Sequence, residues 1–257
     1  MNALIVYFTQ TGNTEQVARA IGRGLDGAGS ETVDLATLRE AGPRDWLDYD
    51  LLALGTPVFY YKEPVNVRDW IASLAPRPQP GPVLTFNTNG GNPTNTFRRL
   101  RKQLKAKGGR VIGSFECLGY DTYPIYLKSF REWDRPNADD LAAAEAFGRD
   151  MAEAAGRFLA GDPVAEPTYP FVGGKHFRLS WICRRPVLNR FFPKLNLDEA
   201  LCTACGACAR ACPTENIRME PGPQFLDRCI RCYLCERICP QNAIQCDWRR
   251  LTRMMNA

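Results

Sequence analysis

The sequence predicts an α/β protein, with a doubly wound parallel sheet in its first two thirds and a second, small domain at its C-terminal end. Short apolar runs alternate with amphipathic helical patterns from residue 3 to about residue 160, which is typical of a parallel sheet covered by helices. Two cysteine runs of equal spacing then occupy residues 202–240. A chain of 257 residues has room for one large domain or two small ones, at roughly 100–200 residues per domain.

The elements of the sheet follow in order. Residues 3–9, ALIVYFT, form a short apolar run of the kind found in buried parallel strands. A helix is expected next, with Asn13 or Thr14 as its N-cap. Its apolar face would be formed by Val17, Ala18, Ile21 and Leu25. Further strands are expected over 31–35, 50–56, 82–88 and 110–117, and helices over 64–74, 94–107 and 138–160.

Composition narrows the class of protein. Hydrophobic residues make up 45% and charged residues 24% of the chain, which is ordinary for a soluble globular protein. The apolar runs are shorter than the roughly 18 residues of a membrane helix, and the N-terminus has no secretory pattern. We therefore expect a cytoplasmic protein, in which the eleven cysteines are metal ligands or redox groups rather than disulfides. The net charge of +5 and the absence of a nucleic-acid-binding signature argue against a nucleic-acid partner.

The loop after the first strand predicts a phosphate site. It offers hydroxyls, a glycine and backbone N–H groups at a helix N-terminus, a set that binds phosphate. It lacks the GxGxxG of a dinucleotide site and the GK[ST] of a P-loop, so a single monoester phosphate fits better. The residues are Thr9, Gln10, Thr11, Gly12, Asn13 and Thr14. Taken alone, TGNT is also compatible with an ordinary helix cap.

The segment TQTGNT after an apolar strand resembles the phosphate loop of flavodoxins. The resemblance to this family covers roughly the first 160 residues. The resemblance implies the strand order 2-1-3-4-5 and bound flavin mononucleotide (FMN). It implies that the flavin ring contacts loops after the third and fourth strands, at Thr56, Pro57, Val58, Phe59, Tyr60, Tyr61, Thr88, Asn89, Gly90 and Gly91. The loop after the fifth strand should begin near the flavin, so Tyr120 and Cys117 are further candidates, and ordinary packing is the alternative for each. The second ring loop lacks the tyrosine that many flavodoxins stack on the flavin. Either Tyr60 or Tyr61 stacks there, or one ring face is open.

The two cysteine runs have the spacing C-x2-C-x2-C-x3-C-P, which is known from bacterial ferredoxins. Zinc sites mostly use two separated pairs of ligands, and these fused, duplicated triplets favour iron–sulfur clusters instead. Residues 197–247 resemble a small α+β bacterial-type ferredoxin domain. The resemblance implies two [4Fe-4S] clusters and an exchange of the fourth ligand between the runs. One cluster is expected on Cys202, Cys205, Cys208 and Cys239, and the other on Cys229, Cys232, Cys235 and Cys212.

The expected domain limits are 1–162 for the flavodoxin-like domain, 163–196 for a linker and 197–257 for the ferredoxin domain with a C-terminal extension. The linker begins as a proline- and glycine-rich connection and continues with basic and aromatic residues. Residues 164–197 carry six basic side chains and one acidic side chain. Three interpretations compete: packing of Trp181, Ile182, Leu188 and Phe191 against the domains, docking of an acidic partner, or contact with an anionic membrane.

Together the two halves predict an electron-transfer protein that connects FMN to two [4Fe-4S] clusters and serves donor and acceptor redox enzymes. It is expected to be an electron carrier more than an enzyme with a substrate of its own. Two alternatives stay open: a flavin-dependent reductase that uses NAD(P)H or a small molecule, and a redox sensor. The oligomeric state is also open, a dimer included. Cys117, Cys183 and Cys246 follow no ligand spacing and are expected to be small buried residues, although Cys117 begins the loop that reaches Tyr120.

Overall fold

The computed structural model describes residues 1–123 and 134–255. Contacts divide the described chain into two units. The first contains residues 1–121 and 134–180, and the second contains residues 122–123 and 181–255. We describe each unit by itself.

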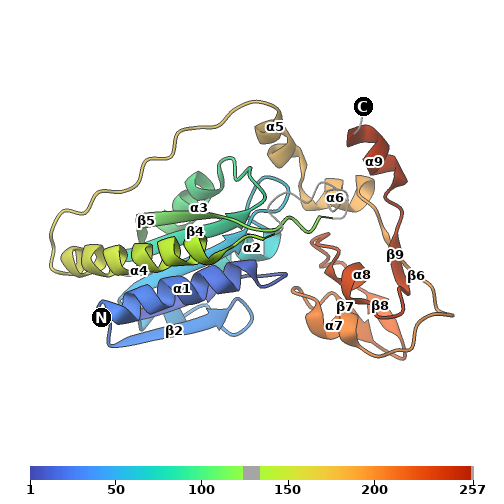
Figure 1. The fold of residues 1–257 in the computed structure, drawn as a ribbon, viewed down its shortest axis with the longest axis horizontal. Helices are drawn as coiled ribbons and strands as arrows, with labels where there is room; N and C mark the ends of the chain where they lie inside the picture. The colour runs from blue at the N-terminus through green and yellow to red at the C-terminus, as the bar shows by residue number, and fades with distance from the viewer. Residues whose placement is uncertain (124–133, 256–257) are drawn as a thin grey trace. The chain divides into compact units, whose positions relative to one another are not determined.

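The first unit is built on one parallel sheet (Figure 1). Its strands are β1 (Asn2–Tyr7), β2 (Thr32–Thr37), β3 (Leu51–Pro57), β4 (Gly81–Asn89) and β5 (Gly109–Leu118). They lie in the order β2-β1-β3-β4-β5, and each neighbouring pair is parallel. The prediction of a doubly wound sheet with the order 2-1-3-4-5 is therefore confirmed.

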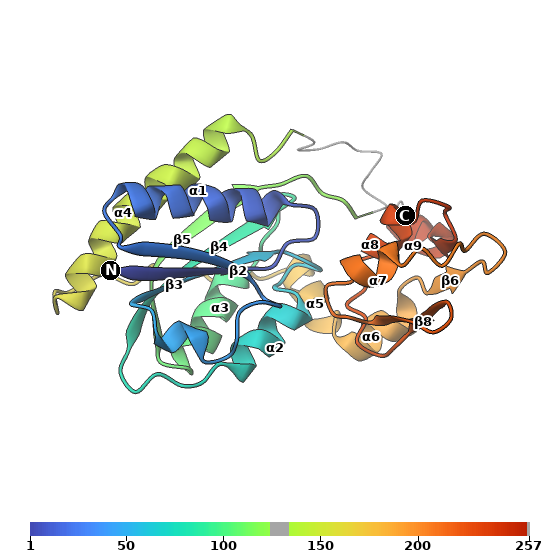
Figure 2. The ribbon, with the colours of Figure 1, turned by 90° about the horizontal axis from the view of Figure 1, so that it is seen from below.

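Helices cover both faces of this sheet. Figure 2 shows α1 (Asn13–Gly27) and α4 (Ala138–Leu159) on one face, and α2 (Val65–Ser73) and α3 (Thr96–Lys105) on the other. A short 3₁₀ helix, Asp45–Leu47, precedes β3. The expected apolar face of the first helix is fully buried, at Val17, Ala18, Ile21 and Leu25. All nine residues of the interior strand β4 are buried as well.

Two glycines let α1 and α4 approach closely. A Cβ atom on Gly24 would lie 2.1 Å from the backbone oxygen of Glu145, and one on Gly148 would lie 2.3 Å from that of Ile21. Any larger residue at either position would push the helices apart. The contact fixes α4 against the helix whose N-terminus carries the predicted phosphate loop.

The second unit is made of short elements. Its strands are β6 (Leu195–Leu197), β7 (Ile217–Met219), β8 (Pro223–Phe225) and β9 (Ile244–Cys246). β6 pairs with β9 and β7 with β8, both antiparallel. Its helices are α6 (Arg185–Phe191), α7 (Ala207–Ala211), α8 (Leu234–Ile238) and α9 (Arg249–Met255). Each predicted cysteine run includes a five-residue helix, α7 or α8, and its fourth cysteine is the C-cap of that helix.

The basic segment between the cofactor regions forms α5 (Lys175–Ile182) and α6. Leu188 is buried, as the packing interpretation expects, but Trp181, Ile182 and Phe191 are 61%, 52% and 57% exposed. That interpretation is therefore wrong for three of its four residues. Local structure explains the difference, because the segment breaks into two short helices and arginines cover the rings. The Arg184 guanidinium lies 4.1 Å from the Trp181 ring centroid.

Across residues 1–123 and 134–255, no helix combines the length and the apolar character needed to cross a membrane.

Candidate cofactor-binding sites

The predicted phosphate loop leads into α1 through Gly12. This residue is the N-cap, with φ of 91°, and it has no side-chain cap hydrogen bond. The expected cap at Asn13 or Thr14 is therefore wrong. Both side chains make other contacts. Asn13 Nδ2 donates to the Tyr120 carbonyl at 3.3 Å, and the Thr14 and Thr88 hydroxyls lie 2.8 Å apart. The first turn of α1 keeps its N–H groups uncapped by side chains, which is the arrangement that suits an anion.

Open space surrounds two glycines at this edge of the sheet. A Cβ atom on Gly12 or on Gly91 would meet nothing within 4 Å, and both residues have positive φ, 91° and 101°. A ligand can therefore reach the backbone directly at both positions. The residues present fit a phosphate at the first glycine and a flat polar edge at the second.

Backbone hydrogen bonds bring the predicted loops together. Val58 N donates to Thr88 O at 3.0 Å, and Gly119 N donates to Asn89 O at 2.9 Å. The loops after β1, β3, β4 and β5 thus meet at one edge of the sheet. Four predicted residues have their hydroxyl groups engaged within the protein. Thr14 and Thr88 bond to each other, Thr56 donates to the Pro57 carbonyl at 2.8 Å, and Thr9 accepts from the Gly12 N–H at 3.0 Å.

Cys117 is placed differently from Tyr120. Its thiol is 3% exposed within the hydrophobic core of the sheet unit. Burial raises the pKa of Cys117 to about 12. It is a packing residue, while the Tyr120 backbone reaches the phosphate loop through Asn13.

The aromatic pair after β3 sits in a strained turn. Phe59 N donates to Lys62 O at 2.8 Å and Lys62 N to Phe59 O at 3.2 Å. The two residues between them, Tyr60 and Tyr61, have φ of 52° and 64°. This is the two-residue hairpin that favours Asn-Gly, because both central residues have positive φ. Two tyrosines in this conformation cost of order 1–3 kcal/mol each, so other contacts must hold the turn.

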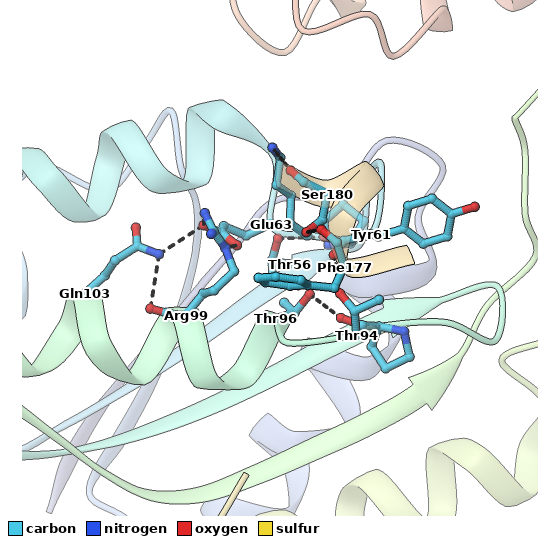
Figure 3. A network of polar contacts seen from close by, with 12 residues as sticks. Thr56, Tyr61, Glu63, Thr94, Thr96, Arg99, Gln103, Phe177 and Ser180 are labelled. Atoms are coloured by element: carbon cyan, nitrogen blue, oxygen red, sulfur yellow. Dashed lines mark hydrogen bonds and ion pairs between the residues drawn. The ribbon is translucent and has the colours of Figure 1, made fainter. Parts of the chain in front are cut away.

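An ion pair with a buried carboxylate lies beside the turn (Figure 3). The Glu63 carboxylate is 0% exposed and accepts from Arg99 Nε at 2.7 Å and Nη2 at 2.8 Å. Gln103 Nε2 adds a bond of 3.0 Å to the same carboxylate. The hydrogen bond to Glu63 raises the pKa of Arg99. The Thr94 hydroxyl donates to the Tyr61 carbonyl from the other side. Sequence analysis missed Glu63; its signal was a carboxylate among apolar and aromatic neighbours, which needs a partner when buried.

One cavity in the second unit draws on both cysteine runs. Its lining includes Cys202, Cys205 and Cys208 from the first run and Cys239 from the second, together with Ala243 and Ile244. This donor set has the chemistry that a [4Fe-4S] cluster needs. In the part of the chain that the structure describes, no three Cys, His, Asp or Glu side chains are arranged to hold a single metal ion.

The charge of Cys212 affects the pKa values of thiols in the second run. Burial, and then the negative charges of Cys229 and Cys212, raise the pKa of Cys232 to about 12. Burial, Cys232, Cys229 and Cys212 likewise raise the pKa of Cys235. Burial and mutual repulsion thus keep these thiols protonated when no metal is bound. A cationic metal group would displace those protons, because thiols that bind metal lose them.

The backbone repeats around the two runs. Residues at equivalent positions share positive φ in three pairs: Ala204 and Arg231, Gly206 and Tyr233, and Glu215 and Asn242. The fourth thiol of each run accepts a backbone N–H from four residues on, at 3.2 Å in both cases, from Asn216 to Cys212 and from Ala243 to Cys239. Backbone of this kind turns successive N–H groups toward an anionic group. For Cys239, burial raises the pKa, but N–H groups of Ile244, Gln241 and Ala243 outweigh it and the pKa is lowered.

Comparisons with known proteins match two separate regions of the chain. The flavodoxin family profile matches residues 5–133, and that of the 4Fe-4S dicluster domain matches residues 194–240. An uncharacterized protein of Methanocaldococcus jannaschii is 27% identical over 155 residues, which cover 59% of this chain and 98% of that protein. One subunit of the H2:CoB-CoM heterodisulfide,ferredoxin reductase of Methanothermobacter thermautotrophicus is 37% identical over 71 residues, covering 20% of this chain and 11% of the reductase polypeptide.

Among solved structures, a flavodoxin from the domain Archaea matches 61% of this chain and 99% of its own length. It is 21% identical, with a TM-score of 0.48.

Proposed function

Because this chain belongs to the flavodoxin family and carries a 4Fe-4S dicluster domain after its flavodoxin domain, we propose that it passes low-potential electrons between redox partner enzymes. The two domains support an electron-transfer role in general. The observation that carries the specific proposal is the cavity lined by three thiols of the first cysteine run and the fourth thiol of the second. Two linked clusters, rather than independent metal sites, explain that exchange.

In the flavodoxin domain, we assign the phosphate of FMN to the loop Thr9–Thr14, with N–H groups of the first turn of α1 as donors. The isoalloxazine ring is assigned to the loops 56–61 and 88–91, with Tyr120 at the margin. Open backbone at Gly12 and Gly91 supports this assignment. FMN, when bound, supplies an exchange between two-electron and one-electron chemistry, and iron–sulfur clusters carry single electrons.

In the dicluster domain, we assign one cluster to Cys202, Cys205, Cys208 and Cys239 and the other to Cys229, Cys232, Cys235 and Cys212. The N–H groups that reach Cys212 and Cys239 support this assignment, because hydrogen bonds to ligating sulfur raise the reduction potential. The short elements hold the thiols in place and keep apolar side chains such as Ile217 and Ile244 beside them.

We place the functional limits at 1–162, 163–196 and 197–257. The match to the reductase polypeptide covers the cysteine region and a small share of that protein, so we transfer iron–sulfur electron transfer from it and not its reaction. We infer donor and acceptor redox enzymes as partners. Since reduced thiols persist in the cytoplasm, we place the protein there.

Anaerobic purification tests the proposal. We expect one FMN per chain and about eight iron and eight sulfide, as two cubanes require. Mixing with NADH or NADPH alone should leave the flavin absorbance unchanged for minutes, while dithionite should bleach both chromophores. Rapid bleaching by either nucleotide would overturn the proposal of an electron carrier and favour a reductase. A preparation that holds zinc in place of iron would overturn the cluster assignment.

A further inference from the structure

Helix α5 lies outside the flavodoxin match of residues 5–133, yet it contacts both ring loops of that domain. The ring of His176, in its first turn, packs on Tyr61 with centroids 4.8 Å apart and 30° between the planes. His176 Nδ1 lies 2.8 Å from Asn92 Nδ2. The chain's one histidine thus bridges the loop after β3 and the loop after β4.

The approach to α5 is fixed on the sheet unit. Asn95 exchanges two hydrogen bonds with the Val172 backbone, at 2.8 and 3.0 Å. Tyr169 stacks on Phe97 with centroids 5.7 Å apart. These contacts attach residues 163–174, which we name the strap, to the start of α3. These contacts hold the chain that leads to His176 in place, and they are independent of the contacts that His176 itself makes.

The other end of α5 is tied to the strained turn. Lys62 Nζ donates to the Ser180 carbonyl at 2.5 Å, and the Ser180 side chain is buried. Figure 3 shows Phe177 and Ser180 of this helix beside the segment that carries Tyr61 and Glu63. The turn is held by Glu63 and Arg99 on one side and by α5 on the other. A turn with two non-glycine residues at positive φ needs such support on both sides.

We propose that the strap and α5 complete the flavin site, and that His176 is a positioning residue for it. His176 holds the Tyr61 ring, through stacking, and the Asn92 amide, through a hydrogen bond, in the two loops assigned to the isoalloxazine ring. The inference rests on the proposed function, because it takes FMN to be the ligand of these loops. It extends the site beyond the part of the chain that the family match covers.

The test uses the full-length chain, freed of FMN and titrated with FMN. His176→Ala removes both contacts, and its FMN dissociation constant should rise about thirtyfold, since an aromatic pair and a hydrogen bond each contribute about 1 kcal/mol. His176→Phe keeps a ring on Tyr61 and should recover most of the affinity. Arg178→Ala, two residues along the same helix, removes an exposed side chain and should stay within about twofold of wild type.

A second measurement reports how the protein packs around bound FMN. The visible circular dichroism of bound FMN depends on the groups packed around the ring, so it should change in His176→Ala and return in His176→Phe. If His176→Ala and Arg178→Ala match wild type in both measurements, the inference is overturned. If His176→Ala fails to fold, His176→Gln replaces it, and unchanged affinity and dichroism in that variant overturn the inference. Wild-type protein that binds no FMN would instead overturn the proposed function.

Discussion

The two units differ in what fills their interiors. The sheet unit buries large apolar side chains completely, among them Trp46, Phe86, Ile5 and Leu51. In the second unit one buried cluster is Cys208, Ile217 and Ile244, with Cys212 and Cys235 packed against it. Its strands have three residues each. One unit is therefore stabilised by a large hydrophobic core, while proposed ligands make up part of the smaller buried interior of the other. Small domains of this kind depend on metal for their folding free energy.

Removal of iron gives the largest expected effect. Chelation under oxidising conditions should unfold residues 197–247 and leave the sheet unit folded, because only the second unit loses its interior. Amide NMR spectra of the chain before and after treatment measure this, with protected amides retained in β1 and β3–β5. Removal of FMN should leave both units folded. A second unit that keeps dispersed, protected amides without iron would contradict the comparison.

Replacement of Cys239 tests which cysteine run shares a cluster with this residue. Cys239→Ala should lower the iron content from about eight to about four and release the thiols of Cys202, Cys205 and Cys208. Alkylation followed by mass spectrometry identifies which thiols react. Cys246→Ala, a cysteine without ligand spacing, is the matched control and should keep full iron. Reaction confined to Cys229, Cys232 and Cys235 would show that each run serves its own cluster.

Loss of the buried ion pair is the largest single-residue effect that we expect in the sheet unit. Arg99→Ala leaves the Glu63 carboxylate buried without its cation, which should lower the free energy of unfolding by about 3 kcal/mol. Urea unfolding of the sheet unit measures it. Lys102→Ala, exposed on the same helix, should change stability by less than about 0.5 kcal/mol. Equal stabilities of the two variants would mean that the pair does not support the Tyr60–Tyr61 turn.

The smallest effect concerns the edge strand. Tyr49 Oη donates to Asp34 Oδ2 at 2.6 Å, and this hydrogen bond, with burial, raises the pKa of Tyr49 to about 12. A raised pKa means that the contribution is complete below pH 10, the ordinary tyrosine value, and disappears as pH rises through 12. Tyr49→Phe should cost about 0.5 kcal/mol at pH 8. The gap should narrow above pH 10 in urea unfolding curves; a constant gap would point to packing instead.

Much of the fold was predictable because its signals are local. The apolar face at Val17, Ala18, Ile21 and Leu25 repeats at helical spacing, and the same four residues are fully buried. The run ALIVYFT covers all of β1 except its first residue, since a strand buried on both faces needs consecutive apolar residues. Loops at the carboxyl ends of parallel strands meet at one edge, so the candidate flavin loops could be found before any contact was known.

Other features of the candidate site had no local signal. The expected cap at Asn13 or Thr14 was wrong because those side chains bond to Tyr120 and Thr88, which are distant in the chain. Tyr60 and Tyr61 carry none of the Asn-Gly signal of their turn, since tertiary contacts hold it against its propensity. The histidine that touches Tyr61 lies in a segment whose composition predicted a linker.

The sequence by itself determined the order of the two domains, the helical and strand periodicities and the eight cysteines with their duplicated spacing. These properties are set by residues close together in the chain. Only the tertiary structure decided that Arg99 reaches Glu63 and that α5 lies over the ring loops. Such pairings depend on how distant segments pack to bury charge and apolar surface together, and no spacing along the chain encodes that choice.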